Sequence, residues 1–236
     1  MPPEADDPAM LAEATGNAAF VLALRERGVR DTAVLRAMEQ VPRERFAPPA
    51  LHALARRDIG LPLASGQTMT APSVVAAMLG ALAMIPGARV LEVGTGTGYV
   101  TALLVRLGAA HIRSFERYEG LARTARAQLG RDLDDATVEV ADGLSPEAVR
   151  GGEFDRILVN GSIEALPPHL PAALKPGGRL VAGLWTGRGS RLVTITRDGG
   201  ALFTRTEGAA LRLGPLTPGR ALARSSGHAV EAASRV

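Results

Sequence analysis

Residues 90–99, VLEVGTGTGY, decide the fold of this chain. Residues 89–93 form a short apolar run typical of a buried parallel strand. Three closely spaced glycines follow, and they predict a tight turn: Gly94, Gly96 and Gly98. From Tyr99 to Leu107 the apolar residues have helical spacing, and Gly108 predicts the end of that helix. A strand, a glycine turn and a helix in this order bring backbone amides close to a ligand at the helix N-terminus.

The glycine spacing separates two classes of cofactor. A dinucleotide-binding turn has the pattern G-x-G-x-x-G, in which the last glycine permits close packing of helix and strand. Counted from Gly94, that position is the bulky Tyr99, so a nicotinamide-dependent dehydrogenase is a weak alternative. The observed pattern, Glu92 and then G-x-G-x-G, resembles the first motif of the S-adenosyl-L-methionine-dependent methyltransferases. Their cofactor carries a sulfonium and an ammonium group, which suits an acid beside the turn.

Two further strand ends carry acids. The expected strand at residues 112–115 is followed by Glu116. In α/β nucleotide-binding domains, an acid at about this distance along the chain from the glycine turn binds the ribose hydroxyls. A third strand, residues 137–140, precedes Asp142, where methyltransferases of this class often hold adenine. The alternatives are a solvated charge at Glu116 and an ordinary turn at Asp142. We expect the cofactor to be bound by Glu92, Gly94, Thr95, Gly96, Thr97, Gly98, Glu116, Asp142 and Gly143.

The composition favours one α/β domain and excludes several functions. A chain of 236 residues can bury one sizeable core, and its formal net charge is only +3 without a contiguous basic block, so we expect no nucleic-acid partner. Without cysteines, the chain has no disulfide, thiolate metal site or cysteine nucleophile, and the four histidines show no ligand spacing, so no metal is expected. The N-terminus lacks a signal segment, and no apolar run reaches the ~20 residues of a membrane span. We expect a cytoplasmic protein without a membrane partner, with a monomer as the default.

Two helices are expected before the sheet. Residues 1–15 are predicted to be disordered, Asn17 to cap a helix that runs to Arg27, and Asp31 to cap a second helix before Pro42. Residues 43–70 contain prolines and glycines with little periodicity, which indicates a long ordered loop of the kind that is often functional.

The remaining strands and helices alternate. Strands are expected at residues 156–159 and 178–184, and a hairpin at residues 191–197 and 201–206. This order predicts a doubly wound, Rossmann-like sheet, mostly parallel, covered on both faces and ending in an antiparallel hairpin. We expect a single domain over residues 16–219, with a helical lead and substrate loop at 16–72 and a cofactor-binding sheet at 73–219. Residues 220–236 are expected to form a flexible tail.

Several segments together resemble one enzyme family. They are VPRERF at residues 41–46, LPLASGQTMTAP at 61–72, the glycine turn, SFER at 114–117 and LKPGGRLV at 174–181. In this order they resemble the protein-L-isoaspartate O-methyltransferases, over most of the chain. The resemblance implies methyl transfer from S-adenosyl-L-methionine to the side-chain carboxylate of L-isoaspartyl residues in damaged proteins or peptides. The ester would then close to a succinimide and reopen partly to normal aspartate, which is repair.

The resemblance also implies the acceptor site. Thr70 stands where the family has a serine at the substrate carboxylate, so we expect it to be catalytic, while a plain helix cap before Pro72 is the alternative. Substrate binding is expected from Gly66, Gln67, Thr68 and Asp58, although Asp58 could equally be a solvated loop charge. An isoaspartyl carboxylate with a pKa of ~3.9 is ionised at neutral pH and needs no general base. The lack of a convincing histidine or lysine base is therefore compatible with carboxyl methylation.

Three departures from the family concern the acceptor. Thr70 adds a methyl group to the serine, Arg56 replaces a usual tyrosine and is expected to change the charge of the substrate cleft, and Asn160 begins a run that replaces T-A-A-A. The alternatives are therefore a methyltransferase for a small carboxylic acid or a nucleic-acid base, or a non-catalytic relative that binds cofactor or peptide. The base is disfavoured because residues 160–163 lack an N-P-P-aromatic motif.

Overall fold

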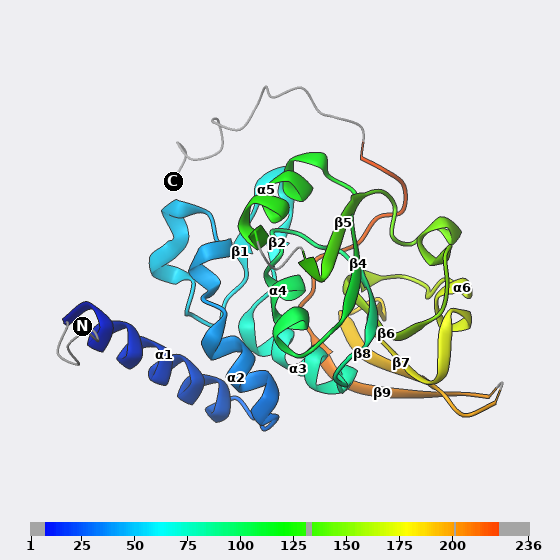
Figure 1. The fold of residues 1–236 in the computed structure, drawn as a ribbon, viewed down its shortest axis with the longest axis horizontal. Helices are drawn as coiled ribbons and strands as arrows, with labels where there is room; N and C mark the ends of the chain where they lie inside the picture. The colour runs from blue at the N-terminus through cyan, green and yellow to red at the C-terminus, as the bar shows by residue number, and fades with distance from the viewer. Residues whose placement is uncertain (1–7, 131–133, 201, 222–236) are drawn as a thin grey trace.

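A seven-stranded sheet forms the centre of the protein, for which a computed structural model describes residues 8–130, 134–200 and 202–221 (Figure 1). The strand order is β5-β4-β3-β6-β7-β8-β9. The strands from β5 to β7 pair in parallel, whereas β8 and β9 pair antiparallel. Their bounds are β3 Arg89–Val93, β4 His111–Glu116, β5 Ala136–Val140, β6 Phe154–Ile163, β7 Leu174–Trp185, β8 Ser190–Arg197 and β9 Phe203–Leu211. The predicted doubly wound sheet with an antiparallel hairpin is confirmed.

Helices cover both faces of this sheet, as the alternation of elements predicts. They are α1 Pro8–Glu26, α2 Thr32–Gln40, α3 Pro72–Leu82, α4 Tyr99–Arg106, α5 Glu119–Leu129 and α6 His169–Ala172. Successive residues of β3 point to opposite faces, so Val90 belongs to the core under α1 to α5, and Leu91 and Val93 belong to the core under α6. Figure 1 shows α6 across the sheet from the N-terminal helices.

The first helix starts earlier than the sequence pattern predicts. α1 begins at Pro8 instead of Asn17, so the prediction of disorder is wrong for residues 8–15. Proline suits the first turn of a helix, and the alanines, leucine and methionine that follow have high helix propensity, which outweighs the acidic, proline-rich start. The second helix is confirmed, because the carboxylate of Asp31 accepts hydrogen bonds from the amides of Ala33 and Val34, at 2.9 and 3.0 Å.

The segment between α2 and α3 is ordered, and it is built from short elements. It contains three 3₁₀ turns, at Arg43–Phe46, Pro49–Leu54 and Ala64–Gly66, and a small hairpin of β1 (Leu61–Pro62) and β2 (Thr68–Met69). Ser65 and Gly66 form the hairpin turn with positive φ angles of 60° and 67°. Because the hairpin pairs only two residues on each side, contacts with the rest of the molecule must hold this segment in place.

The later strands are longer than their apolar runs. β6 and β7 extend beyond the expected residues 156–159 and 178–184, and β9 reaches Leu211. Residues 1–7 and 222–236, which hold most of the predicted disordered ends, lie outside the described residues, as does position 201 at the expected start of the last strand. Within the described part of the chain, no helix has the length and apolar character needed to cross a membrane.

The strand order fixes where a ligand can bind. From β3 the chain continues through β4 to β5 on one side, and later returns to place β6 and β7 on the other side. Open parallel sheets bind ligands at such a reversal, outside the carboxyl ends of the strands. Here the reversal lies between β3 and β6, next to Gly94 and Asn160, which are joined by a hydrogen bond of 3.1 Å.

Candidate active site

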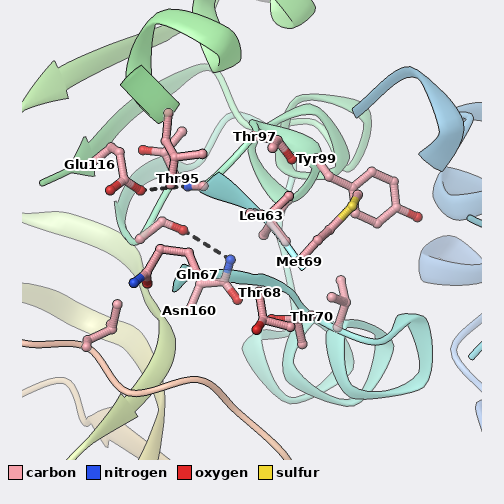
Figure 2. Close-up of a pocket in the computed structure, with 16 residues that line it drawn as sticks. Leu63, Gln67, Thr68, Met69, Thr70, Thr95, Thr97, Tyr99, Glu116 and Asn160 are labelled. Atoms are coloured by element: carbon pink, nitrogen blue, oxygen red, sulfur yellow. Dashed lines mark hydrogen bonds between the residues drawn. The ribbon is translucent and has the colours of Figure 1, made fainter. Parts of the chain in front are cut away.

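A cleft lies at the carboxyl edge of the parallel strands (Figure 2). One part, of about 520 Å³ including space open to solvent, lies between the glycine turn and residues 63–70; we call it the loop half. The other part, of about 430 Å³, lies beside the ends of β4 and β5; we call it the strand half. The two halves adjoin each other, because both are lined by Gln67, Gly94, Glu116 and Leu216.

The three glycines of the turn have different roles. All have positive φ angles, 94° at Gly94, 58° at Gly96 and 93° at Gly98, which other residues rarely adopt. A Cβ on Gly94 would lie 3.0 Å from the carbonyl oxygen of Asn160, and one on Gly98 would lie 3.2 Å from Leu129 of α5. These two glycines therefore permit close packing. Around Gly96 no atom lies within 4 Å of a Cβ position, and this residue lines the loop half, so it leaves space for a ligand.

Glu116 joins the glycine turn to the end of β4. Its carboxylate accepts a hydrogen bond of 2.9 Å from the amide of Gly96 (Figure 2). It accepts another, also of 2.9 Å, from the amide of Tyr118. Burial raises the pKa of Glu116, and the backbone amides of Tyr118, Gly96 and Arg117 oppose that shift. The side chain of Glu116 lines both halves of the cleft.

Glu92 lies beneath the turn and does not line the cleft. It is fully buried, and its Oε2 accepts hydrogen bonds of 2.6 Å from the hydroxyls of Thr101 and Ser114. The hydroxyls of Ser114 and Thr95 lie 2.6 Å apart. Since a serine hydroxyl has one proton, which Ser114 donates to Glu92, Thr95 is the donor in that second contact. Strand alternation explains the placement, because Glu92 shares the face of Val90, toward α4.

The ionisation of Glu92 is set by this burial. Burial raises the pKa of Glu92 to about 7, the two hydroxyls lower it, and the like charge of Glu116 adds to the increase. The second carboxyl oxygen, Oε1, has no hydrogen-bond partner among the described residues. Glu92 is thus an acid that supports the glycine turn from below, through Ser114 and Thr95.

Asp142 and Gly143 line the strand half, where the sequence predicts the adenine site. The carboxylate of Asp142 accepts hydrogen bonds from the amide of Leu144 at 2.9 Å and from that of Gly219 at 2.6 Å. A Cβ on Gly143 would lie 2.8 Å from side-chain atoms of Phe115 and Val93, so this glycine also permits close packing beneath the cleft. Thr95 and Thr97 line the loop half but are largely buried.

Some residues of the predicted substrate loop line the cleft, and others do not. Gln67, Thr68 and Thr70 line the loop half, whereas Gly66 is exposed and lies outside it. The amide of Gln67 donates to the carbonyl of Ala64 at 3.2 Å, so it is not free to bind a carboxylate. Among the hydrogen bonds of the described residues, none involves the Thr70 hydroxyl. That hydroxyl is available to an acceptor substrate.

Asp58 has the capping role that Thr70 lacks. The N-cap residue of α3 is Ala71, which makes no side-chain cap bond. The amide of Ser73, in the first turn of α3, donates instead to Oδ1 of Asp58 at 2.8 Å. Oδ2 of Asp58 lies 2.8 Å from Nε of Arg27. The structure therefore does not bring Asp58 to the cleft.

The lining of the cleft differs from the sequence-based expectation at two other residues: Arg56 is absent from it and Leu216 is present. Arg56 is not in the substrate cleft, because its Nε pairs with Glu44 at 2.5 Å and its guanidinium packs against Gly16 of α1. Leu216, for which the sequence gives no signal, lines both halves of the cleft from the segment that follows β9. Its amide donates to the carbonyl of Ser162 at 2.8 Å, which holds this segment against the end of β6.

Comparison with known proteins identifies the family. Residues 15–220 match the model of the protein-L-isoaspartate(D-aspartate) O-methyltransferase family. The chain is 43% identical over 222 residues to a protein-L-isoaspartate O-methyltransferase of Bradyrhizobium sp. (strain ORS 278), with 93% of this chain and 98% of the relative covered. It is 45% identical over 210 residues to the protein of that name from Xanthobacter autotrophicus, with 86% and 92% covered.

The fold is shared with a solved structure of low sequence identity. A Plasmodium falciparum protein described as a β-aspartate methyltransferase of this type was crystallised with S-adenosyl-L-homocysteine. The two structures align with a TM-score of 0.68 at 23% identity, over 83% of this chain and 96% of the other. The family match covers residues 15–220, and the alignment with the Bradyrhizobium relative covers 93% of the chain. The matched range includes the glycine turn, Glu116 and Thr70, which line one cleft. This chain belongs to the protein-L-isoaspartate(D-aspartate) O-methyltransferase family.

Proposed function

We propose that this protein transfers a methyl group from S-adenosyl-L-methionine to the side-chain carboxylate of L-isoaspartyl residues in proteins and peptides. One observation carries the proposal beyond family membership. Gly96 of the cofactor turn and Thr70 of the substrate loop line the same half of one cleft. A methyl donor held by the turn would therefore face an acceptor held by the loop, which is what a displacement between two bound molecules requires.

The residues of the cleft fit this cofactor. We propose that Gly94, Thr95, Gly96 and Thr97 hold its methionine part, that Glu116 binds its ribose, and that Asp142 and Gly143 border its adenine. The open space at Gly96, which any side chain would fill, supports this placement. When bound, the cofactor supplies an activated methyl group on a sulfonium. We propose that Glu92 and Gly98 act indirectly, by supporting the turn.

The acceptor half of the reaction is proposed to rest on orientation. Thr70 would donate a hydrogen bond to the substrate carboxylate, with Gln67 and Thr68 beside it. The carboxylate is already ionised at neutral pH, so no side chain has to remove a proton. Of the described residues that line the cleft, none is a histidine or a lysine. A site without such a base favours a carboxylate over an amine, which is protonated at this pH.

The methyl ester makes the repair reaction possible without further help from the protein. The backbone amide nitrogen that follows the isoaspartyl residue attacks the ester carbonyl, and methanol leaves as the succinimide ring closes. Water then opens the ring at either carbonyl, which yields normal aspartate in part and isoaspartate in part. We further propose that the enzyme acts in the cytoplasm as a monomer, on proteins and peptides and not on nucleic acid, through the domain at residues 16–219.

Two measurements test this function. Labelled S-adenosyl-L-methionine is incubated with a matched pair of peptides that differ only in isoaspartate or aspartate at one site. We expect base-labile label on the isoaspartyl peptide alone, and label on neither peptide, with cofactor binding confirmed separately, would contradict the proposal.

The second measurement addresses Thr70. Thr70→Ala should lower kcat for the isoaspartyl peptide by about tenfold or more, because the acceptor loses its orienting donor. Thr70→Ser, which keeps the hydroxyl, should retain activity, and the affinity for S-adenosyl-L-homocysteine should be unchanged in both variants. An unchanged kcat in the alanine variant would remove Thr70 from the acceptor site.

A further inference from the structure

Arg43 is a buried arginine whose guanidinium group binds only backbone carbonyl oxygens within the described part of the chain. Its side chain is 2% exposed, which is rare for an arginine without a carboxylate partner. Nη1 donates to the carbonyl of Ala55 at 2.7 Å, and Nη2 lies 3.2, 3.3 and 3.0 Å from the carbonyls of Ile59, Met69 and Thr70. One side chain thus contacts the middle and the end of the segment between α2 and α3.

These contacts supply what the segment itself lacks. Between α2 and α3 only the two-residue strands β1 and β2 pair with each other, so local hydrogen bonding does little to fix residues 55–59 against residues 69–70. Burial lowers the pKa of Arg43, and nearby Tyr99, Asp58 and Glu44 oppose that shift. A guanidinium remains charged when buried and presents five donors in a planar fork, so it can bind several carbonyls at once.

The clamped carbonyls belong to residues of the cleft. Met69 and Thr70 line the loop half, and Arg43 binds the carbonyl oxygens of both. On the other side of Thr70, Asp58 binds the amide of Ser73 and so fixes the start of α3. The backbone of Thr70 is thereby held from two directions, which fixes the position from which its side chain reaches the cleft.

We propose that Arg43 is a positioning residue for methyl transfer, which sets the position of Thr70 relative to the cofactor turn without contacting the substrate. The inference rests on the proposed function, because it assigns Arg43 a part in the same reaction. Its consequence is that loss of the guanidinium fork lowers the rate of methyl transfer more than it lowers cofactor affinity. Displacements of about 1 Å from the reactive geometry can reduce a rate by about 100-fold.

The test compares two buried arginines in the full-length protein. Arg43→Lys keeps the charge and loses the fork. Arg156→Lys is the matched control, because Arg156 is 7% exposed and its guanidinium donates to the carbonyls of Ala83 and Asp155, at 2.9 and 2.7 Å, near the amino end of β6. Both are assayed at a temperature where circular dichroism shows them folded, and Arg43→Gln is the second variant if the lysine variant does not fold.

We expect Arg43→Lys to lower kcat for an isoaspartyl peptide by about 10- to 100-fold, with affinity for S-adenosyl-L-homocysteine within about threefold of wild type. Arg156→Lys should lower stability and leave kcat unchanged. A wild-type kcat in folded Arg43→Lys would overturn the inference, as would an equal loss of kcat in both variants. If the wild-type protein itself fails to methylate the isoaspartyl peptide, it is the proposed function that fails.

A double-variant cycle shows whether Arg43 acts through Thr70. If it does, Arg43→Lys combined with Thr70→Ala should have about the same kcat as Thr70→Ala alone, since the second change removes what the first one misplaces. If the two losses multiply, Arg43 acts independently of Thr70 and the assignment is wrong. If kcat falls in Arg43→Lys but is unchanged in Thr70→Ala, the assignment is likewise wrong.

Discussion

Glu92→Gln should remove a large pH dependence from the stability of this protein. Burial raises the pKa of Glu92 from 4.5 to about 7 in the folded protein, with the hydroxyls of Ser114 and Thr101 opposing and Glu116 adding to that increase. The side-chain amide of glutamine has nearly the same shape as the carboxyl group of Glu92, and its oxygen can accept the hydrogen bonds from both the Ser114 and the Thr101 hydroxyl. Its nitrogen would occupy the place of Oε1, which has no partner among the described residues.

The sign and size of the effect follow from linkage. Between pH 4.5 and about 7 the folded protein holds a proton on Glu92 that the unfolded chain releases. The contribution of this carboxyl to stability is therefore fully present below pH 4.5 and is lost as the pH rises through 7. At 1.36 kcal/mol per pKa unit, a shift of this size corresponds to about 3 kcal/mol. The variant has no such titration.

The assay is urea denaturation of the two proteins from pH 5 to pH 9. The free energy of unfolding of the variant minus that of wild type should rise with pH by up to about 3 kcal/mol and level off above about pH 8. Taking the difference cancels the titration of all groups that do not interact with Glu92. Glu164→Gln, at an exposed glutamate, is the control for the chemical change alone.

Two results would refute this reasoning. A difference that does not change with pH would mean that the carboxyl of Glu92 has the same pKa in the folded and unfolded states. A difference that falls as the pH rises would mean that the folded protein favours the carboxylate, for instance through a cation beside the turn.

Two further substitutions separate the roles of the glycines. Gly96→Ala should leave the fold intact at a cost of about 1–2 kcal/mol for the left-handed backbone and abolish binding of S-adenosyl-L-homocysteine in equilibrium dialysis; normal affinity would place the cofactor elsewhere. Gly143→Ala brings a Cβ within 2.8 Å of Phe115 and should lower the free energy of unfolding by about 1–3 kcal/mol. Gly120→Ala, at an open helical position of α5, is the control and should raise stability by up to about 1 kcal/mol; equal effects at both sites would refute the packing role.

Local signals predicted the elements around the cofactor turn. β3 has the expected bounds, because a buried central strand shows as an unbroken apolar run. The cap at Asp31 could be predicted because it depends on a single residue and its close neighbours in the chain. The helix at residues 8–16 is not apparent from the sequence, because a composition rich in proline and acids obscures the helix propensity of the residues that follow Pro8.

Tertiary contacts decided what the sequence pattern did not. β6 and β7 are longer than their apolar runs because they continue to pair with each other beyond these runs, at Phe154 with Leu174 and at Ile163 with Leu184. Leu216 lies in the cleft through hydrogen bonds of its segment to β6, and no periodicity announces such a contact. The resemblance places Arg56 in the cleft, where the family has a tyrosine, but the loop folds so that the Arg56 side chain pairs with Glu44.

The positions of some residues of the candidate site could be predicted from the sequence, whereas others depend on tertiary contacts. Glu116 ends a strand of the parallel sheet, and Gly96 and Asp142 come shortly after two others. The carboxyl ends of these strands meet at one edge, so the convergence of the three residues could be predicted from their order in the chain. The position of Glu92 could have been predicted from strand alternation, since it shares the face of Val90. The capping role of Asp58 could not, because it depends on how the loop folds back on α3.

The measurement that tests the account most directly is to locate the transferred methyl group on one peptide. The peptide carries an isoaspartyl residue, a normal aspartate, a lysine and a serine, and tandem mass spectrometry identifies the modified residue after a single turnover. The account predicts one methyl group on the isoaspartyl carboxyl, removed by mild base. Methylation of the lysine or the serine would contradict it, because the described residues that line the cleft include no histidine or lysine base to remove a proton from them. Methylation of the normal aspartate, which is also ionised, would contradict the claim that the substrate loop selects the isoaspartyl carboxylate.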